Sequence, residues 1–492
     1  MQLSLQHHYL DLGEAFSQQI APVSVREPGL IAFNNALANQ LGIPGKATDN
    51  ELAAIFSGNS VPQDARPIAM AYSGHQFGHF NPQLGDGRAI LLGELETPEQ
   101  IFDIHLKGSG QTAFSRNGDG RAALGPVIRE YLLSEAMHQL GVPTTRALAA
   151  VTTGEQVARE QLLPGGVITR VAKSFVRVGT FQYFASRGEF GSVQKLADFV
   201  ITRCYPDMQP ADNPYVELLR EACHRQARLI AKWMQLGFIH GVMNTDNMAI
   251  SGETIDYGPC AFIDDYCHDK VFSSIDRNGR YAYNQQPSIG LWNLTRLAEC
   301  LLPLFSDDKD EAVKIATDCL DTFEPEFQHA WLDGMRNKCG LTDIAGQASA
   351  DRALLEGLLN IMHDSGADFT LTFTYLSQLN SQPDGQDIAF QERFSDAQAI
   401  GTWLQQWRQR LQYETQDDVT RQSRMRSVNP AYIPRNHQVE AAIRAAEDQG
   451  DFSVFHSLYN VLQTPFAGSD EHADYQLPPQ PDEVVERTFC GT

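Results

Sequence analysis

The sequence contains the stretch His240-Gly241-Val242-Met243-Asn244-Thr245-Asp246-Asn247, followed by Asp256-Tyr257-Gly258. Asn247 lies seven residues after His240, and Asp256 lies nine residues after Asn247. Carboxylate and amide oxygens, completed by phosphate oxygens and waters, are the ligands that Mg²⁺ prefers. Asn247 and Asp256 are therefore a candidate pair of metal ligands. A turn capped by Asn and Asp is the structural alternative.

The spacing of these residues matches the catalytic and metal-binding loops of protein kinases. Kinases use H-R-D-x-x-x-x-N followed by D-F-G, in which the first Asp is the base and the Asn and second Asp bind the metal. Here Val242 stands where the catalytic Asp would be, and its side chain cannot exchange a proton. Asp246 is the nearby carboxylate that could act as the base instead.

The sequence around this stretch predicts a helix before it and a hairpin after it. Apolar residues recur at helical spacing over residues 216–236. Two short apolar pieces, 248–250 and 254–255, flank Ser251-Gly252 and predict a small hairpin. Helical periodicity dominates residues 190–460.

A second pattern places a lysine at the end of a strand. Residues 101–107 alternate as in a strand with one apolar face, and they end at Lys107. Pro126 then opens a helix that carries Glu130. Kinases hold nucleotide phosphates with a strand-end Lys that a helical Glu orients. A solvated surface charge is the alternative for Lys107.

The sequence Gly-Asp-Gly-Arg occurs twice, at residues 85–88 and 118–121. Glycines allow backbone N–H groups to approach an anion, and the arginine supplies a forked donor that matches phosphate oxygens. The two copies therefore predict phosphate-binding loops. A pair of ordinary turns is the alternative, because Gly and Asp are common in turns.

A cluster of basic residues follows the second copy. Arg170, Lys173 and Arg177 lie within eight residues that contain no acid, which is unusual in so acidic a chain. Their charges would suit the far end of a triphosphate. A solvated charged edge is the alternative.

Composition excludes several classes of protein. The chain has 492 residues and a formal net charge of −23, which would repel a phosphate backbone, so no nucleic-acid partner is expected. No apolar run reaches the roughly 18 residues of a membrane span. The N-terminus carries no readable signal or transit peptide. We therefore expect a cytoplasmic protein with no membrane partner.

The patterns together predict an α+β fold with a smaller mixed α/β N-terminal lobe and a larger, mainly helical C-terminal lobe. The predicted units are residues 1–180, with the glycine-rich loops, 181–468, with the metal and catalytic loop, and 469–492. The last unit is an acidic tail with several prolines, and its residues 470–487 are expected to be extended and mobile. Cys490 is a candidate redox-active thiol, whereas most other cysteines are expected to be buried.

These motifs resemble the selenoprotein O family, also called YdiU, of protein adenylyltransferases with a pseudokinase-like fold. The resemblance rests on the motifs YSGHQFGHFNPQLGDGRAILLGE, LKGSGQT, GDGRA, IREYL, HGVMNTDNM and IDYGP. It implies a protein-kinase-like bilobal fold. It also implies transfer of AMP, or UMP, from ATP, or UTP, to Ser, Thr or Tyr hydroxyls of proteins, with release of pyrophosphate.

The resemblance further implies how the nucleotide binds. In the family, ATP lies in the reverse of the kinase orientation, with the γ-phosphate inward. Arg170 and Arg177 would grip the β- and γ-phosphates. The residues that match nucleotide-binding positions of the family are Gly85, Gly87, Arg88, Lys107, Asp119, Gly120, Arg170, Arg177 and Asp256.

Catalytic and metal-binding roles are implied in the same way. Asn247 and Asp256 would hold Mg²⁺ or Mn²⁺, and Asp246 would be the general base. Glu130 would orient Lys107.

A regulatory disulfide known from some family members is less well matched. It joins a Cys or selenocysteine near the C-terminus to the activation-loop region. Cys490 matches the terminal position, but Ser273 and Ser274 stand where the partner cysteine would lie.

Two other functions stay open. A small-molecule kinase that transfers the γ-phosphate is suggested by His240-Gly241, because such kinases often contain H-G-D, although Val242 argues against it. A catalytically silent nucleotide-binding scaffold is suggested by the absence of the usual base.

Overall fold

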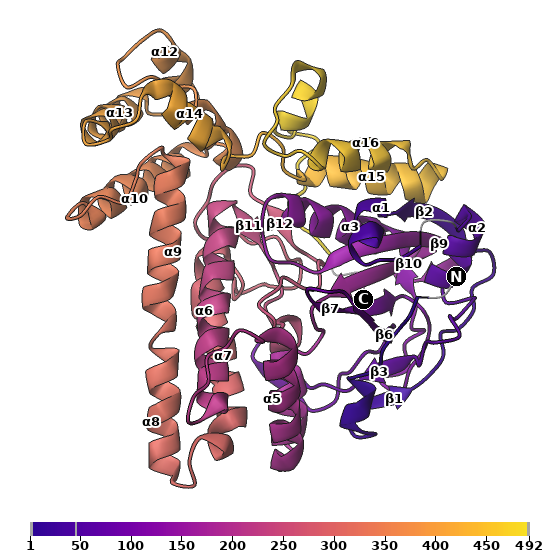
Figure 1. The fold of residues 1–492 in the computed structure, drawn as a ribbon. Helices are drawn as coiled ribbons and strands as arrows, with labels where there is room; N and C mark the ends of the chain where they lie inside the picture. Colours follow the sequence, from indigo (N-terminus) through magenta and orange to yellow (C-terminus); the bar gives the residue numbers. More distant parts are fainter. Residues whose placement is uncertain (1–2, 45–46, 490–492) are drawn as a thin grey trace.

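The computed structural model describes residues 3–44 and 47–489 (Figure 1). Strands of the main sheet lie between residues 17 and 172, and helices make up most of the regular structure after residue 178. The predicted mixed composition, with a sheet in the N-terminal region and helices in the C-terminal region, is confirmed. The boundaries at residues 180 and 468 stay predictions.

Within the described residues, the main sheet has eight antiparallel strands, in the order β1-β3-β6-β7-β10-β9-β2 with β8 paired to β10. These strands are β1 (Ser17–Gln19), β2 (Gly29–Phe33), β3 (Ile68–Met70), β6 (Ala89–Glu96), β7 (Ile101–Lys107), β8 (Ala122–Ala123), β9 (Arg146–Ala158) and β10 (Leu162–Ala172). Two separate pairs are β4 (Gly74–Gln76) with β5 (His79–Asn81), and β11 (Phe238–Ile239) with β12 (Ala261–Phe262).

The helices are numbered in the order in which they occur in the chain. The α-helices are α1 (Asn35–Gln40), α2 (Asp49–Phe56), α3 (Leu124–Gln139), α4 (Val178–Ala185), α5 (Phe190–Cys204), α6 (Pro214–Gln235), α7 (Gln286–Phe305), α8 (Lys309–Leu320), α9 (Phe323–Lys338), α10 (Ala348–Ser365), α11 (Phe369–Leu376), α12 (Gln386–Gln391), α13 (Ala397–Leu411), α14 (Asp418–Arg426), α15 (Asn436–Gln449) and α16 (Ser453–Leu462). Short 3₁₀ helices are η1 (Leu10–Leu12), η2 (Thr245–Asn247), η3 (Tyr283–Gln285) and η4 (Asp470–Gln476).

The two faces of the sheet bury different side chains, because neighbouring residues of a strand point to opposite faces. On β10, Val167 and Val171 belong to a core shared with α1 and α2, whereas Ile168 belongs to the larger core that includes α3. Ile168 pairs with Lys107 of β7, and Arg170 is two residues further along β10. Lys107 and Arg170 therefore lie on the face of the sheet that α3 covers.

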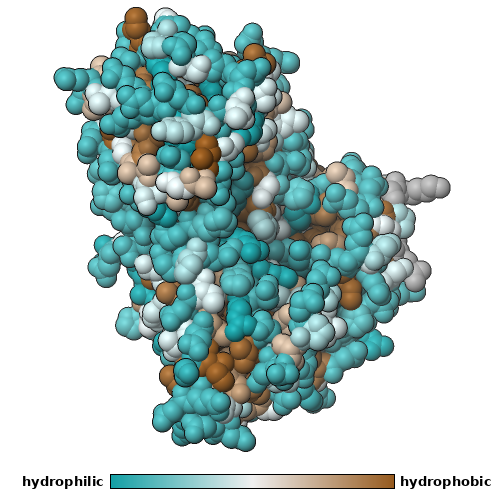
Figure 2. All heavy atoms as spheres, turned by 60° about the vertical axis from the view of Figure 1, so that its left-hand side comes forward, coloured by the Kyte–Doolittle hydropathy of each residue, from teal (hydrophilic) through white to brown (hydrophobic). Residues whose placement is uncertain are grey.

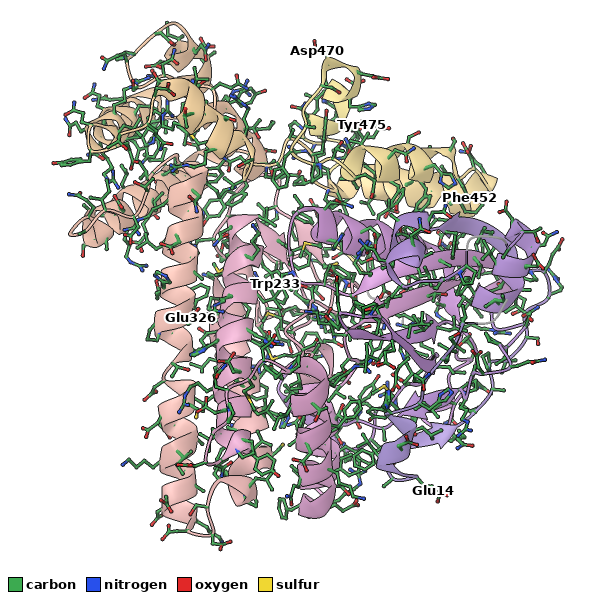
Figure 3. The ribbon with its side chains drawn as sticks, viewed as in Figure 1. Glu14, Trp233, Glu326, Phe452, Asp470 and Tyr475 are labelled. Carbon is green, nitrogen blue, oxygen red and sulfur yellow. The ribbon has the colours of Figure 1, made fainter. Side chains whose placement is uncertain are left out.

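Helix α6 leads the chain to the segment that contains the candidate metal ligands. Pro214 occupies its first turn, and the Asn213 side chain caps its free N–H groups. Trp233, near the end of the helix, points into the interior (Figure 3), where its indole N–H donates to Thr254 Oγ1 at 2.9 Å. Gly237, with φ of +69°, then turns the chain into β11.

The predicted hairpin around Ser251-Gly252 is wrong. Ala249 instead pairs with Arg177, and Thr254 pairs with Thr144. Each short segment satisfies its backbone groups with a more distant part of the chain, so the two do not pair with each other. The result ties Arg177 directly to the segment that follows Asn247.

The C-terminal helices α15 and α16 return to the N-terminal region and pack on α3 (Figure 1). Glu447 Oε1 accepts a hydrogen bond from the Gly125 N–H at 2.7 Å, which satisfies a free donor in the first turn of α3. The ring of Phe455 contacts that of Tyr131 edge-on, with centroids 5.5 Å apart. Residues after 436 therefore support the helix that carries Glu130.

The prediction that residues 470–487 are extended is wrong for the first part of this stretch. Residues 470–476 form η4, and Thr488 is buried. Thr488 donates its N–H to the Phe272 carbonyl at 2.9 Å and its hydroxyl to the Pro259 carbonyl at 2.5 Å. The Ser274 N–H in turn donates to the Thr488 carbonyl at 3.0 Å. Cys490 lies outside the described residues.

The surface seen in Figure 2 is mainly hydrophilic, and its hydrophobic residues form small scattered groups. In the described part of the chain, no helix is both long and apolar enough to cross a membrane. The described cysteines are buried except Cys267, which is partly exposed.

Removing the Phe455 ring tests the contact between the C-terminal helices and α3. We expect Phe455→Ala to lower the free energy of unfolding by about 3–5 kcal/mol, because the side chain is fully buried and would leave a cavity. Urea denaturation measures the change. The control Tyr413→Ala, at a side chain that is 60% exposed, should change it by less than about 0.5 kcal/mol. Equal effects of the two variants would contradict the packing described.

Candidate functional site

A cavity of about 670 Å³ lies between the sheet, α3 and the segment 242–259. Residues from five separate parts of the chain line it. The residues expected to bind nucleotide or metal, to act as base or to orient Lys107 are among them: Gly85, Gly87, Arg88, Lys107, Asp119, Gly120, Glu130, Arg170, Arg177, Asp246, Asn247 and Asp256. The structure thus brings all of these residues together. Lys173, the third member of the basic cluster, is not among the residues that line the cavity.

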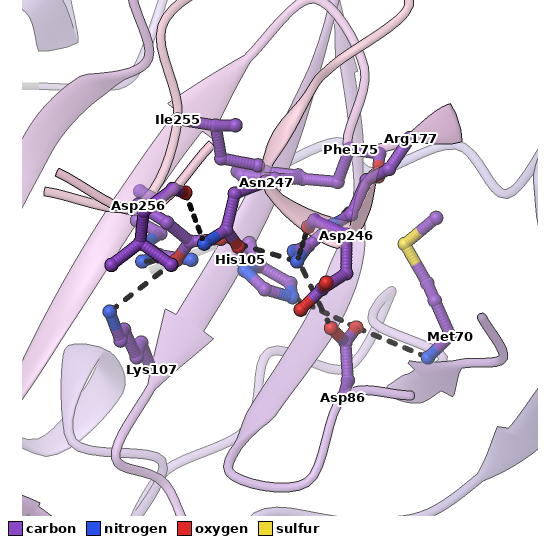
Figure 4. Close-up of polar contacts among 12 residues, drawn as sticks. Met70, Asp86, His105, Lys107, Phe175, Arg177, Asp246, Asn247, Ile255 and Asp256 are labelled. Carbon is purple, nitrogen blue, oxygen red and sulfur yellow. Dashed lines mark hydrogen bonds and ion pairs between the residues drawn. The ribbon is translucent and has the colours of Figure 1, made fainter. Parts of the chain in front are cut away.

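Lys107, Glu130, Arg170 and Asp256 form a charged network at the base of the cavity. Figure 4 shows Lys107 and Asp256 of this network. The Lys107 ammonium donates to Glu130 Oε2 at 2.8 Å and lies 3.5 Å from Asp256 Oδ1. Arg170 uses Nε to contact Glu130 and Nη2 to contact Asp256. Burial and the nearby Arg170 lower the pKa of Lys107, although Glu130 and Asp256 oppose this shift. Charge-assisted bonds hold each member in place.

The carboxylate of Asp256 forms ion pairs with three positively charged side chains. Arg177 Nη1 donates to its Oδ2 at 3.2 Å, in addition to the contacts from Lys107 and Arg170. Burial alone would raise the pKa of Asp256, but Arg170, Arg177 and Lys107 hold it well below its usual range. Its φ of +62° lies in the left-handed region, which is strained for a residue other than glycine. Asp256 is therefore a firmly ionised carboxylate held in a strained backbone.

Arg177 connects Asp256 to the segment that carries Asp246. Its Nη1 also donates to the Asp246 carbonyl at 2.9 Å, and Nη2 lies 3.8 Å from Asp86 Oδ1. The guanidinium stacks over the Tyr72 ring, 4.4 Å from its centroid. Burial would lower the pKa of Arg177, but the charges around it raise it.

Asp246 has one carboxylate oxygen without a partner in a buried position. Its Oδ2 accepts a hydrogen bond from Gln76 Nε2 at 3.0 Å, whereas no group of the described residues bonds Oδ1. Burial raises the pKa of Asp246 to about 6, although Gln76 and Arg177 oppose the shift. Asp246 lines the cavity, and a buried carboxylate whose pKa is raised can accept a proton from a group bound there.

The β4–β5 hairpin braces the loop that carries Asp246. The His75 N–H donates to Thr245 Oγ1 at 2.7 Å, and the Phe77 N–H donates to Asn244 Oδ1 at 3.1 Å. Gly74 lies so close to Asp246 that a Cβ atom there would overlap the carboxylate. The β4–β5 hairpin therefore fixes the position of Asp246.

Asn247 and His240 are held by backbone groups of the same loop. Asn247 Nδ2 donates to the Val242 carbonyl at 3.0 Å, which fixes the orientation of its amide oxygen. His240 Nε2 bonds the Ile255 carbonyl at 2.8 Å, and burial lowers the pKa of the imidazole. His240 is thus a neutral, structural residue that links the two stretches quoted from the sequence.

The two Gly-Asp-Gly-Arg copies have different roles although their sequences are identical. Asp86 is buried and accepts hydrogen bonds from the Met70 N–H and from His105 Nε2, both at 3.1 Å. Asp119 is exposed and pairs with Arg159 at 2.8 Å. Gly85 must be glycine, because its φ is +72° and a Cβ atom would overlap the Phe114 ring.

Sequence reasoning assigned no role to Gln76, Tyr72, Asp86 or Arg159, which also line the cavity. The first three lie in the long motif on which the family resemblance rests. Their contacts reach residues up to 170 positions away, such as Asp246 from Gln76. No local periodicity could have indicated such contacts.

Oxygen donors that could hold a divalent cation are Asn247 Oδ1 and the Asp256 carboxylate. Both residues line the cavity, and the Asn247 amide is already oriented. Among the described residues, no group of three or more His, Cys, Asp or Glu side chains could hold a metal ion. These two residues therefore fit a hard cation such as Mg²⁺ only if a bound ligand and waters supply further oxygens.

Comparison with known proteins identifies the family. A family model for protein adenylyltransferase SelO matches residues 1–463. The protein nucleotidyltransferase YdiU of Rhizobium johnstonii is 56% identical over 485 residues, which cover 98% of this chain and 96% of the relative. The YdiU protein of Rhizobium meliloti is 55% identical with 98% of both chains covered, and that of Agrobacterium fabrum is 53% identical over the full length of both. The chain therefore belongs to the SelO family and is a nucleotidyltransferase.

Proposed function

We propose that the protein transfers AMP, or UMP, from ATP, or UTP, to Ser, Thr or Tyr hydroxyls of other proteins and releases pyrophosphate. A protein-kinase-like bilobal fold, with lobes at 1–180 and 181–468 and a tail at 469–492, is part of this proposal. The observation that carries it is the position of Arg170 and Arg177 on Asp256 at the buried end of the cavity.

Burial determines which end of the nucleotide faces inward. Arg170 and Arg177 are 2% and 3% exposed, whereas Asp119 lies at the open side of the cavity. Binding of a triphosphate is most favourable when its terminal phosphates pair with these arginines in place of the Asp256 carboxylate. Charge interactions are strongest at such a site, because it is shielded from water. The γ-phosphate then lies inward, and the α-phosphate lies toward an acceptor hydroxyl.

This orientation makes the β- and γ-phosphates the leaving group. The acceptor oxygen forms a bond to the α-phosphorus, and the bond from that phosphorus to the α,β-bridging oxygen breaks. Arg170 and Arg177 stabilise the negative charge that develops on the departing pyrophosphate. Lys107, oriented by Glu130, contacts the phosphates from the strand end.

Asp246 is the proposed base for the acceptor hydroxyl. Its carboxylate lines the cavity and can accept the hydroxyl proton, while the hydrogen bond from Gln76 to Oδ2 fixes its orientation. Asn247 and Asp256 would hold Mg²⁺ or Mn²⁺. When bound, the ion would neutralise phosphate charge in the transition state.

Position-specific labelling separates this function from its rivals. With ATP labelled at the α-phosphorus, we expect label on proteins of a nucleotide-free bacterial lysate. The variant Asp256→Asn, which keeps the side-chain size, should lower this transfer by about 100-fold or more. Label from the γ-phosphorus on a small acceptor would instead support a small-molecule kinase. Binding with no transfer of either label would support a silent scaffold.

Removal of the Arg177 guanidinium should discriminate between nucleotides. We expect Arg177→Ala to weaken ATP binding by about 10–100-fold and to leave AMP binding nearly unchanged, because charged hydrogen bonds to the terminal phosphates are lost. Calorimetry measures both affinities. The control is Arg187→Ala, an exposed arginine that stacks on Tyr183 outside the cavity. If the variant lost the same affinity for ATP as for AMP, Arg177 would not contact the β- and γ-phosphates of ATP.

Loss of the Gln76 amide should affect turnover more than binding. We expect Gln76→Ala to lower kcat by about 10–100-fold with little change in the KM for ATP, because the amide positions Asp246 and has no charge for phosphate. Steady-state kinetics measures the two constants. Gln83→Ala, at an exposed position shortly after the same hairpin, is the matched control. A large rise in KM with unchanged kcat would contradict this positioning role.

A further inference from the structure

Two histidines outside the cavity face each other at the protein surface. His268 follows β12, and His363 lies in the last turn of α10. Their Nδ1 atoms are 3.1 Å apart, and the rings meet edge-on with centroids 4.1 Å apart. His268 is exposed and His363 is partly exposed, so solvent reaches the pair. Neither residue has a role in the proposed reaction.

The backbone on both sides holds this pair in place. The Tyr266 N–H donates to the Ala367 carbonyl at 2.9 Å, and the Phe369 N–H donates to the Asp264 carbonyl at 2.8 Å. Arg435 bridges the two segments by contacting Asp264 and Asp368. The two imidazoles are therefore brought together by segments that are already fixed to each other.

The separation of the two nitrogens fits two ligands of one metal ion. Imidazole nitrogens bind Zn²⁺ at about 2.0–2.1 Å, so two bonds that meet at a tetrahedral or slightly smaller angle place the nitrogens about 3.1–3.4 Å apart. A hydrogen bond between two neutral rings gives a similar distance, with one ring donating and the other accepting. Distance alone does not separate these two states.

Two further side chains with metal-binding chemistry adjoin His268 in the sequence. Asp269 is exposed beside the pair, and its Oδ1 accepts a hydrogen bond from Cys267 Sγ at 2.8 Å. A carboxylate and a thiol thus lie within the same short segment as one of the imidazoles.

We propose that His268 and His363 bind one divalent transition-metal ion of the Zn²⁺ type at the surface. The described residues contain no group of three converging ligands, so water completes the coordination. Imidazole ligands select such ions over Mg²⁺, which prefers oxygen. The bound ion would join the segment 264–270 to α10. This site is separate from Asn247 and Asp256 and does not depend on the proposed reaction.

Zinc titration of the untagged, full-length protein tests the site. The protein is first treated with a chelator, and excess Mg²⁺ is then kept present so that oxygen sites are occupied. Calorimetry with Zn²⁺ alone as the titrant should detect one equivalent bound with micromolar affinity. His268→Gln and His363→Gln should each weaken binding at least tenfold, since a site with two protein ligands loses half of them. His329→Gln, an exposed histidine 3.2 Å from Asp333, should bind as the wild type does.

Copper resonance spectra of the wild type provide a measurement that does not depend on variants. Cu²⁺ at one equivalent should give hyperfine coupling from two imidazole nitrogens. The proposal is overturned if the wild type binds no Zn²⁺, if either His268→Gln or His363→Gln keeps full affinity, or if the copper spectrum indicates oxygen ligands only. Circular dichroism of the two variants verifies that each is folded.

Discussion

The shared ion pairs of Asp256 are the constraint on which the site depends. The Asp256 carboxylate forms ion pairs with Lys107, Arg170 and Arg177. Glu130, on α3, forms ion pairs with Lys107 and Arg170. Buried ion pairs contribute little net stability, because desolvation offsets their attraction. Removing one partner is costly, however, since it leaves a buried charge unpaired. The network is therefore better explained by what it can bind than by what it adds to stability.

The fold brings these charges together from distant parts of the chain. Pairing of β7 with β10 sets Lys107 and Arg170 on one face, and α3 lays Glu130 against them. Backbone pairing of Arg177 with Ala249 draws the segment after Asn247 to the same place. The C-terminal helices support α3 from outside. Elements far from the cavity thus contribute to its geometry.

Local patterns in the sequence predicted the strand 101–107 and the helix that carries Glu130, because alternation and the position of proline act over a few residues. The hairpin at 248–255 was wrong, because Ala249 and Thr254 find their backbone partners far away in the sequence. For the same reason the contact of Gln76 with Asp246 could not be foreseen. The extended conformation was wrong for residues 470–476, which form η4. The candidate residues were found through motifs, whereas their mutual geometry required the fold.

In the proposed reaction, a triphosphate displaces Asp256 from Arg170 and Arg177 and lies with its terminal phosphate inward. A crystal structure of the complex with α,β-methylene-ATP and Mg²⁺ tests it most directly. We expect the β- and γ-phosphates to contact the two arginines and the α-phosphorus to lie nearest to Asp246. A γ-phosphate directed toward Asp246, with both arginines still bound to Asp256, would contradict it.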